Sequence, residues 1–114
     1  MHEMSLAMNI VDLAVVKAQE AGARKITEIS LEVGALSGVM AEALTFCLGA
    51  ASRQTMAEGA HFAVATIDGE ARCLGCGLDF SVEALACPCP RCGGYASDLI
   101  QGRELRISSL VVDE

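Results

Sequence analysis

The hydrophobic positions near the start of the chain recur with the spacing of an amphipathic helix. Polar residues occupy the other side of this segment, which predicts one face packed on a core and one face in water. Ser5 is the expected N-cap, and Gly22 is the expected end of the helix. Over residues 5–21 the apolar side chains fall three or four positions apart, at Leu6, Ile10, Leu13 and Ala14.

A second helix is predicted over residues 39–53, after a segment at 34–38 with the composition of a turn. We expect Cys47 to be a small buried hydrophobic residue in this helix. The apolar face follows helical spacing and consists of Leu44, Cys47, Leu48 and Ala51.

Three segments have the composition of half-buried strands, namely residues 26–33, 61–67 and 103–112. In the last segment the apolar positions change parity between Ile107 and Leu110. A bulge near Ser108 and Ser109 would return both parts of that strand to one buried face.

A cysteine-rich module separates the second and third strands. Within it, residues 78–82 resemble a short strand, with Phe80 as the natural core residue. The order of elements predicts an α+β fold in which two helices pack on one face of a three-stranded sheet and the module is inserted between strands. We therefore divide the chain into an α/β domain, residues 1–68 and 99–114, and an inserted domain, residues 69–98.

The composition excludes several classes of partner. With 8 Lys and Arg against 15 Asp and Glu, the formal net charge is −7. This charge disfavours a nucleic-acid partner, because phosphate binding needs a basic patch. No apolar run approaches the roughly 20 residues that a membrane-spanning helix needs. We expect a soluble cytoplasmic protein, present as a monomer or a weak homodimer.

Four cysteines form two matched pairs in the inserted module. Cys73 and Cys76 make one Cys-x-x-Cys-Gly sequence, and Cys89 and Cys92 make another. Two such turns can place four thiolates at the corners of a tetrahedron, the arrangement that a structural zinc ion prefers. The module is therefore expected to be a zinc ribbon. Cys87 is left over, because the other choices lose the two-residue spacing.

Two other interpretations compete with a zinc ribbon. A pair of disulfides would need an oxidising compartment, and the first residues lack the basic run of a signal peptide. A thioredoxin-like redox pair would explain one Cys-x-x-Cys and leave the second without a role. The chain has no evident nucleophile–base pair or phosphate-binding loop, so we expect no enzyme activity.

The chain opens with Met1, His2 and Glu3. A free α-amine, the next amide nitrogens and the His2 imidazole can close chelate rings around one ion. Square-planar nitrogen donors of this kind suit Ni(II) or Cu(II). A histidine at position 2 is more often just a solvated terminal residue, so this motif needs support from elsewhere in the chain.

Four motifs together resemble the hydrogenase-maturation nickel chaperones of the HypA/HybF family, and the resemblance runs from end to end. The first is the opening Met-His-Glu, and the second is the Val-Gly-Ala-Leu-Ser-Gly-Val turn at residues 33–39. The third is the pair of cysteine turns. The fourth is the Gly-Arg-Glu-Leu-Arg-Ile strand at residues 102–107.

The resemblance implies that His2 is the key Ni(II) ligand, completed by the Met1 amine and the backbone amides of His2 and Glu3. The Glu3 side chain would shape this site or a docking surface, and the four paired cysteines would hold structural Zn(II). The protein would deliver nickel to a [NiFe]-hydrogenase large-subunit precursor with the family's GTPase as partner. Urease accessory proteins remain open as further partners.

Two positions depart from the family pattern. Met40 and Ala41 stand where a Pro often precedes the acidic residue that opens the second helix, and Cys87 is extra. Cys87 could exchange into the zinc set or bind a second metal. His61 is expected at the surface, with an auxiliary nickel ligand as the alternative. The alternative function is a zinc-ribbon protein–protein adaptor without specific nickel transfer.

Overall fold

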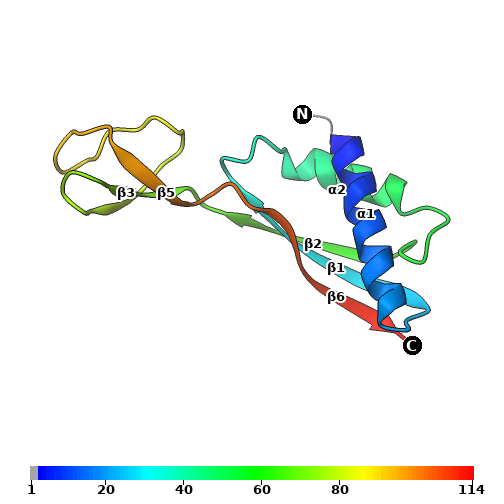
Figure 1. The fold of residues 1–114 in the computed structure, drawn as a ribbon. Helices are drawn as coiled ribbons and strands as arrows, with labels where there is room; N and C mark the ends of the chain where they lie inside the picture. Colours follow the sequence, from blue (N-terminus) through cyan, green and yellow to red (C-terminus); the bar gives the residue numbers. More distant parts are fainter. Residues whose placement is uncertain (1–2) are drawn as a thin grey trace.

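The structure, a computed structural model, describes residues 3–114 and is elongated, with extents of 54 × 25 × 16 Å. A three-stranded sheet occupies each end, and both helices lie beside the longer sheet (Figure 1). The predicted α+β architecture of two helices on a three-stranded sheet is confirmed. The elements are α1 (Glu3–Glu20), β1 (Lys25–Gly34), α2 (Ala41–Ala51), β2 (His61–Ile67), β3 (Glu70–Cys73), β4 (Asp79–Ser81), β5 (Ser97–Gln101) and β6 (Leu105–Asp113).

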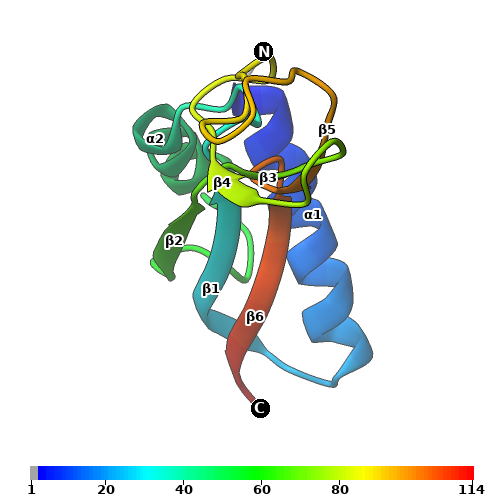
Figure 2. The ribbon, with the colours of Figure 1, turned by 90° about the vertical axis from the view of Figure 1, so that its left-hand side faces the viewer.

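The longer sheet has the strand order β2-β1-β6. The central strand β1 runs parallel to β2 and antiparallel to β6. Helix α2 connects β1 to β2, and a crossover of this kind allows neighbouring strands to run parallel. Both helices cover the same face of the sheet, with α1 on the β6 side and α2 on the β2 side (Figure 2).

Strand β1 lies at the centre of the main core, because it is the middle strand beneath both helices. Burying a branched aliphatic side chain of this kind contributes about 1.5–3 kcal/mol relative to leaving it exposed. Four of its residues are at most 2% exposed, namely Ile26, Ile29, Leu31 and Val33.

The predicted bulge in the last strand is confirmed at Ser108. Ser109 pairs with Ser30, but Ile107 pairs with the very next residue of β1, so Ser108 is the extra residue. The bulge restores the parity of the strand. As a result, Ile107 and Leu110 both pack against the main core.

Helix α1 buries mainly small side chains, and its predicted apolar face is confirmed at Leu6, Ile10 and Ala14 but not at Leu13. Leu13, which the spacing placed on the core face, is 50% exposed. The distance between packed helices depends on the side chains at the contact, so the small residues let α1 lie close to its neighbours. Within residues 3–114, neither helix has the length and apolar character needed to span a bilayer. The residues that α1 buries are Ala7, Val11, Ala14 and Ala18.

The two ends of α1 differ in how well they were predicted. The helix begins at Glu3, so Ser5 lies inside the first turn and the N-cap prediction is wrong. Gly22 ends the helix as predicted, with a φ of +74°. This conformation lets the amide of Ala23 donate to the carbonyl of Ala18 at 3.0 Å, which satisfies a carbonyl of the last turn.

Helix α2 falls inside the predicted segment of residues 39–53. Leu44 and Leu48 are fully buried in the main core, and Cys47 packs against the same core while remaining partly accessible. The N-cap residue is Met40, whose own side chain makes no capping hydrogen bond. The start of α2 therefore has amide donors that another part of the chain can satisfy.

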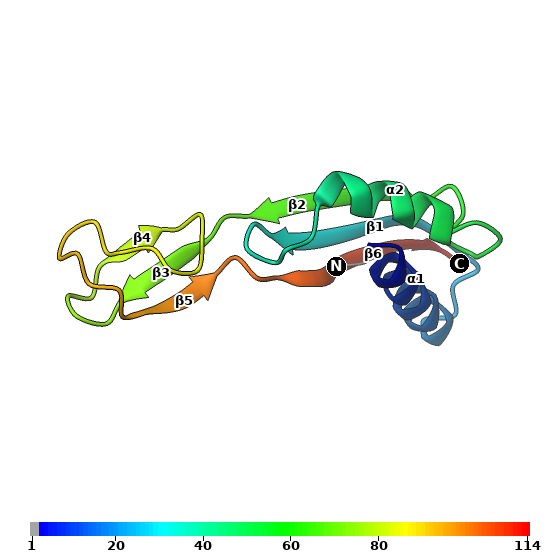
Figure 3. The same ribbon diagram turned by 90° about the horizontal axis from the view of Figure 1, so that it is seen from above.

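The second sheet has the strand order β4-β3-β5 and extends away from the helices (Figure 3). Only β4 was predicted, and its Phe80 lies in a small core with Ala71 and Val82. The other two strands, β3 and β5, have only 4 and 5 residues and carry few apolar positions. Such short strands show too little periodicity to be recognised from the sequence.

Three glycines join the connections of the second sheet to the turn at residues 34–38. A Cβ at Gly34 would overlap the carbonyl of Gly102, and a Cβ at Gly102 would lie 2.7 Å from the Cα of Gly69. The amide of Leu36 donates to the carbonyl of Gly102 at 2.7 Å. This junction attaches both connecting segments to the turn that leads into α2.

Candidate metal centre

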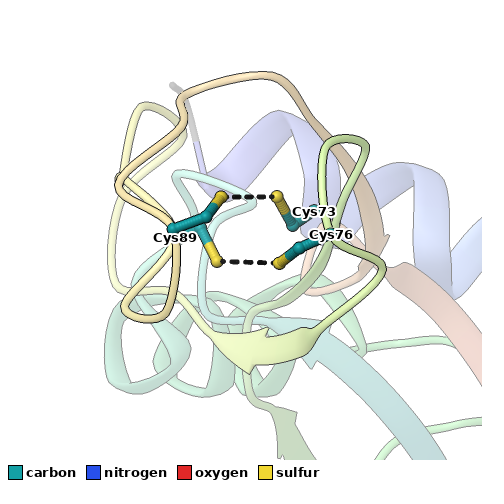
Figure 4. A group of neighbouring side chains, drawn as sticks. Cys73, Cys76 and Cys89 are labelled. Carbon is teal, nitrogen blue, oxygen red and sulfur yellow. Dashed lines mark hydrogen bonds between the residues drawn. The ribbon is translucent and has the colours of Figure 1, made fainter.

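Four cysteine sulfurs converge in the loops of the second sheet. The Sγ atoms of Cys73, Cys76, Cys89 and Cys92 all lie within 4.8 Å of one another. The Cys73–Cys92 and Cys76–Cys89 pairs are 3.5 Å and 3.6 Å apart (Figure 4). Sulfurs at about 2.3 Å from a tetrahedral zinc ion lie about 3.8 Å apart, whereas a disulfide needs about 2.05 Å. The separations therefore suit four thiolates around one ion.

Each cysteine pair is held by a turn with the same hydrogen bond. In the first turn the amide of Gly77 donates to the carbonyl of Cys73 at 2.9 Å, and in the second the amide of Gly93 donates to the carbonyl of Cys89 at 2.8 Å. Gly77 and Gly93 have φ values of +77° and +76°. A residue with a side chain is disfavoured in this conformation, which explains the glycine after each Cys-x-x-Cys.

Two of the four thiols have lowered pKa values, which favours their ionised form. The amide of Leu78, followed by the Arg91 guanidinium, lowers the pKa of Cys76 to about 6. The amide of Cys76 is the main cause of a lowered pKa at Cys73. Thiolates are the form of cysteine that binds metal, so these two positions favour binding.

The pKa of the Cys92 thiol is raised rather than lowered. The amide of Gly94 lowers its pKa, but the adjacent sulfurs of Cys73 and Cys89, together with partial desolvation, outweigh that effect and raise the pKa to about 11. Thiolates that lie close together repel one another, so the last one to form is disfavoured. A cation at the centre of the cluster would remove this penalty.

Arg91 connects the two turns, and the sequence analysis did not identify it. Its Nη2 donates to the carbonyl oxygen of Cys76 at 2.8 Å. Arg91 lies inside the second Cys-x-x-Cys, whereas Cys76 closes the first. No sequence signal distinguishes such an arginine from a solvated one, because the contact forms only when the two turns meet.

The remaining cysteines lie outside the cluster. Cys87 is partly buried against the small core of the second sheet, and its Sγ donates to the carbonyl of Ala84 at 3.4 Å. Cys47 is on α2, at the other end of the molecule. Among residues 3–114, the structure thus gathers the four paired cysteines and leaves Cys87 apart.

The expected nickel ligands Met1 and His2 lie outside the described residues. Glu3 is the first residue of α1, and its Oε2 accepts a hydrogen bond from the amide of Met40 at 3.5 Å. The Glu3 carboxylate therefore links the start of α1 to the start of α2. His61 is exposed at the start of β2, which agrees with the expected surface position.

Comparisons with known proteins agree over nearly the whole chain. A family model described as hydrogenase/urease nickel incorporation, metallochaperone, hypA, matches residues 1–112. Two curated relatives named hydrogenase maturation factor HypA come from Chlorobaculum tepidum and Geotalea daltonii, and are 45% and 41% identical to the chain. These alignments cover 99% and 98% of this chain and 100% and 99% of the relatives.

Solved structures have the same fold. The solution structure of the Ni metallochaperone HypA from Helicobacter pylori matches with a TM-score of 0.71 at 23% identity, over 99% of this chain and 98% of that one. A second solution structure, described as HypA protein, matches with a TM-score of 0.73 at 23% identity, over 98% of this chain and 96% of that one. At this level of identity the likeness supports the fold alone.

Proposed function

Because this chain belongs to the HypA family of hydrogenase and urease nickel-incorporation metallochaperones, we propose that it binds Ni(II) with its first three residues and delivers the ion during maturation of a [NiFe]-hydrogenase. The observation that carries this proposal is the family match over residues 1–112. The match includes the Met-His-Glu start, whose donor atoms suit nickel.

The nickel site would use backbone nitrogen as well as one side chain. The Met1 amine, the amides of His2 and Glu3 and the His2 imidazole supply four nitrogen donors, and this set favours square-planar Ni(II). The Glu3 carboxylate accepts a hydrogen bond from the amide of Met40, so the Glu3 side chain is engaged at the start of α2 while the Glu3 backbone amide would serve the metal. This contact supports a carrier site located beside the start of α2.

The four-cysteine cluster would hold a structural Zn(II). Four protein ligands complete the tetrahedral coordination and leave no open position for substrate, unlike a catalytic zinc site. The lowered pKa values of Cys76 and Cys73 support metal binding there. Its role would be to stabilise the loops of the second sheet, because metal binding supplies folding free energy to small modules.

We also propose the division of the chain into a nickel-binding unit, residues 1–68 and 99–114, and an inserted zinc unit, residues 69–98. The inserted unit would begin just after β2 ends at Ile67. Its proposed end at residue 98 falls inside β5, whose later residues Leu99 and Gln101 still pair with β3 of the second sheet. The partners would be the family's maturation GTPase and the hydrogenase large-subunit precursor, with urease accessory proteins as further candidates. These encounters would take place in the cytoplasm.

The test is complementation of a hydrogenase-producing host that lacks its own family member. The native protein should restore hydrogenase activity at low nickel, and His2→Ala should restore it only when nickel is added in excess. His61→Ala is the matched control, because it removes the other histidine of the chain. Equal restoration by the native protein and His2→Ala at low nickel would favour an adaptor without nickel transfer.

A further inference from the structure

Arg91 makes a contact between the two cysteine turns that the zinc ligands alone do not require. Its backbone lies between Cys89 and Cys92, and its guanidinium reaches the carbonyl of Cys76 at 2.8 Å. The two partners are 15 residues apart in sequence. A side chain from one turn therefore holds the backbone of the other turn at a ligand residue.

The charge of the module makes this position important. Four thiolates around one divalent cation leave a net charge of −2 at the centre. The inserted module contains only two cations, Arg72 and Arg91. Arg72 already makes two hydrogen bonds to the carboxylate of Asp79, at 2.7 Å and 3.1 Å. Arg91 is the cation beside the cysteines, because it hydrogen-bonds to Cys76 and the charges of Cys76, Cys89 and Cys92 raise its pKa.

We infer that Arg91 is a positioning residue of the metal centre, which ties the two Cys-x-x-Cys turns together and offsets the negative charge of the four thiolates, so that it slows metal loss. This inference rests on the proposed zinc site. The residue does not itself bind the ion. It acts through the backbone of Cys76 and through its charge, as other residues outside the ligand set do in zinc sites.

Arginine suits both parts of this role. The guanidinium is planar, always charged and carries several N–H donors in a fixed arrangement. A lysine would keep the charge but would lose that geometry, and a glutamine would keep a donor but lose the charge. The two substitutions therefore separate the electrostatic contribution from the hydrogen bond.

The experiment compares zinc-loaded wild type, Arg91→Gln, Arg91→Lys and the control Arg72→Gln. The first measurement is the rate of zinc transfer to a coloured chelator at low and high salt, and the second is the thiolate-to-metal absorption of the Co(II)-substituted proteins. We expect zinc loss to be faster by about tenfold or more in Arg91→Gln, as for other residues that support metal ligands. Arg91→Lys should be intermediate, and Arg72→Gln should resemble wild type.

The salt dependence of the zinc-loss rate distinguishes an electrostatic role of Arg91 from a purely structural one. If charge is offset by Arg91, the difference between wild type and Arg91→Gln should shrink as ionic strength rises, because exposed charges are screened. Far-UV circular dichroism checks that each variant is folded. If Arg91→Gln does not fold, the inference is decided by Arg91→Lys, which must lose zinc faster than Arg72→Gln.

Two results would overturn the inference. One is zinc loss from Arg91→Gln at the wild-type rate, and the other is equal acceleration in Arg91→Gln and Arg72→Gln. Failure of the zinc proposal would look different, because wild type itself would then fail to take up one tetrahedral Co(II) or Zn(II) ion per chain.

Discussion

The carboxylate of Glu3 lies 3.5 Å from the backbone nitrogen of Met40, at the point where α2 begins. Met40 has no capping side chain of its own. The first amides of a helix lack partners within it and carry partial positive charge, so a carboxylate is favourable there. Since Glu3 also follows His2 directly, this contact joins the expected nickel motif to the second helix.

The contact predicts a small loss of stability in Glu3→Gln. A carboxylate near a helix N-terminus typically contributes about 0.3–1 kcal/mol. Glu3 lies in the first turn of α1 and beside the start of α2, and the neutral amide should lose most of that contribution at both helices. Glu20→Gln, at the other end of α1, is the control, because a carboxylate near a helix C-terminus is not stabilised by the dipole. Urea denaturation of the zinc-loaded proteins measures the difference, and an equal change in both variants would contradict the account.

The close contact between Gly34 and Gly102 predicts that Gly34→Ala loses more stability than Glu3→Gln. In Gly34→Ala the new Cβ would overlap the carbonyl of Gly102, so the junction must shift. Overpacking of this kind typically costs about 1–3 kcal/mol. Thermal unfolding of the zinc-loaded protein should show a clear drop in Tm.

Gly49→Ala is the matched control for that experiment. Gly49 is inside α2, and a Cβ there would meet nothing within 4 Å. Alanine favours a helix interior over glycine by about 0.5–1 kcal/mol, so this variant should be more stable than wild type. Destabilisation by both substitutions would argue against a special role for the junction.

Loss of one zinc ligand should affect the second sheet selectively. Cys73 ends β3 and is 2% exposed within the small core of that sheet. In Cys73→Ser we expect loss of zinc and faster amide hydrogen exchange in β3, β4 and β5, because the metal supplies folding free energy there. The far-UV helix signal should remain, since α1 and α2 pack on the other sheet.

Cys87→Ser is the control for ligand loss, because Cys87 lies outside the sulfur cluster. It should keep one zinc ion per chain and normal exchange in the second sheet. Cooperative loss of the helix signal in Cys73→Ser would contradict the two-unit proposal. Loss of zinc in Cys87→Ser would show that the ligand set includes the fifth cysteine of the module.

Zinc binding should strengthen as the pH rises. At neutral pH the Cys92 thiol, whose pKa is raised to about 11, is mostly protonated in the metal-free protein, so zinc must displace that proton. Cys76, with its pKa lowered to about 6, contributes little to this dependence above neutral pH. The apparent affinity should rise by about tenfold per pH unit for each displaced proton. Chelator competition between about pH 6.5 and 8 measures it, and an affinity independent of pH would contradict the prediction.

The sequence was sufficient to predict the longer sheet, both helices and the grouping of the four cysteines. These features depend on long periodic segments or on fixed spacing, which a single sequence displays. The bulge at Ser108 was also predictable, because the apolar positions changed parity there. The buried face of α1 was predicted only in part. Leu6, Ile10 and Ala14 pack in or against the main core as expected, but Leu13 is exposed and the small Ala7 and Ala18 are buried instead.

The contacts that could not be predicted from the sequence are all between segments far apart along the chain. Arg91 and Cys76 come together only when two turns fold against each other, and Glu3 meets Met40 only when α1 and α2 pack. The short strands β3 and β5 depend on pairing with each other rather than on their own composition. Each case needs knowledge of which distant segments meet.

The most direct test of the central claim is a Ni(II) titration of tag-free, zinc-loaded protein with its native Met1, carried out beside His2→Ala. We predict a yellow square-planar absorption band that saturates at one nickel per chain in wild type and is absent in the variant, with zinc retained in both. Equal nickel binding by wild type and His2→Ala would contradict a carrier site at the N-terminus.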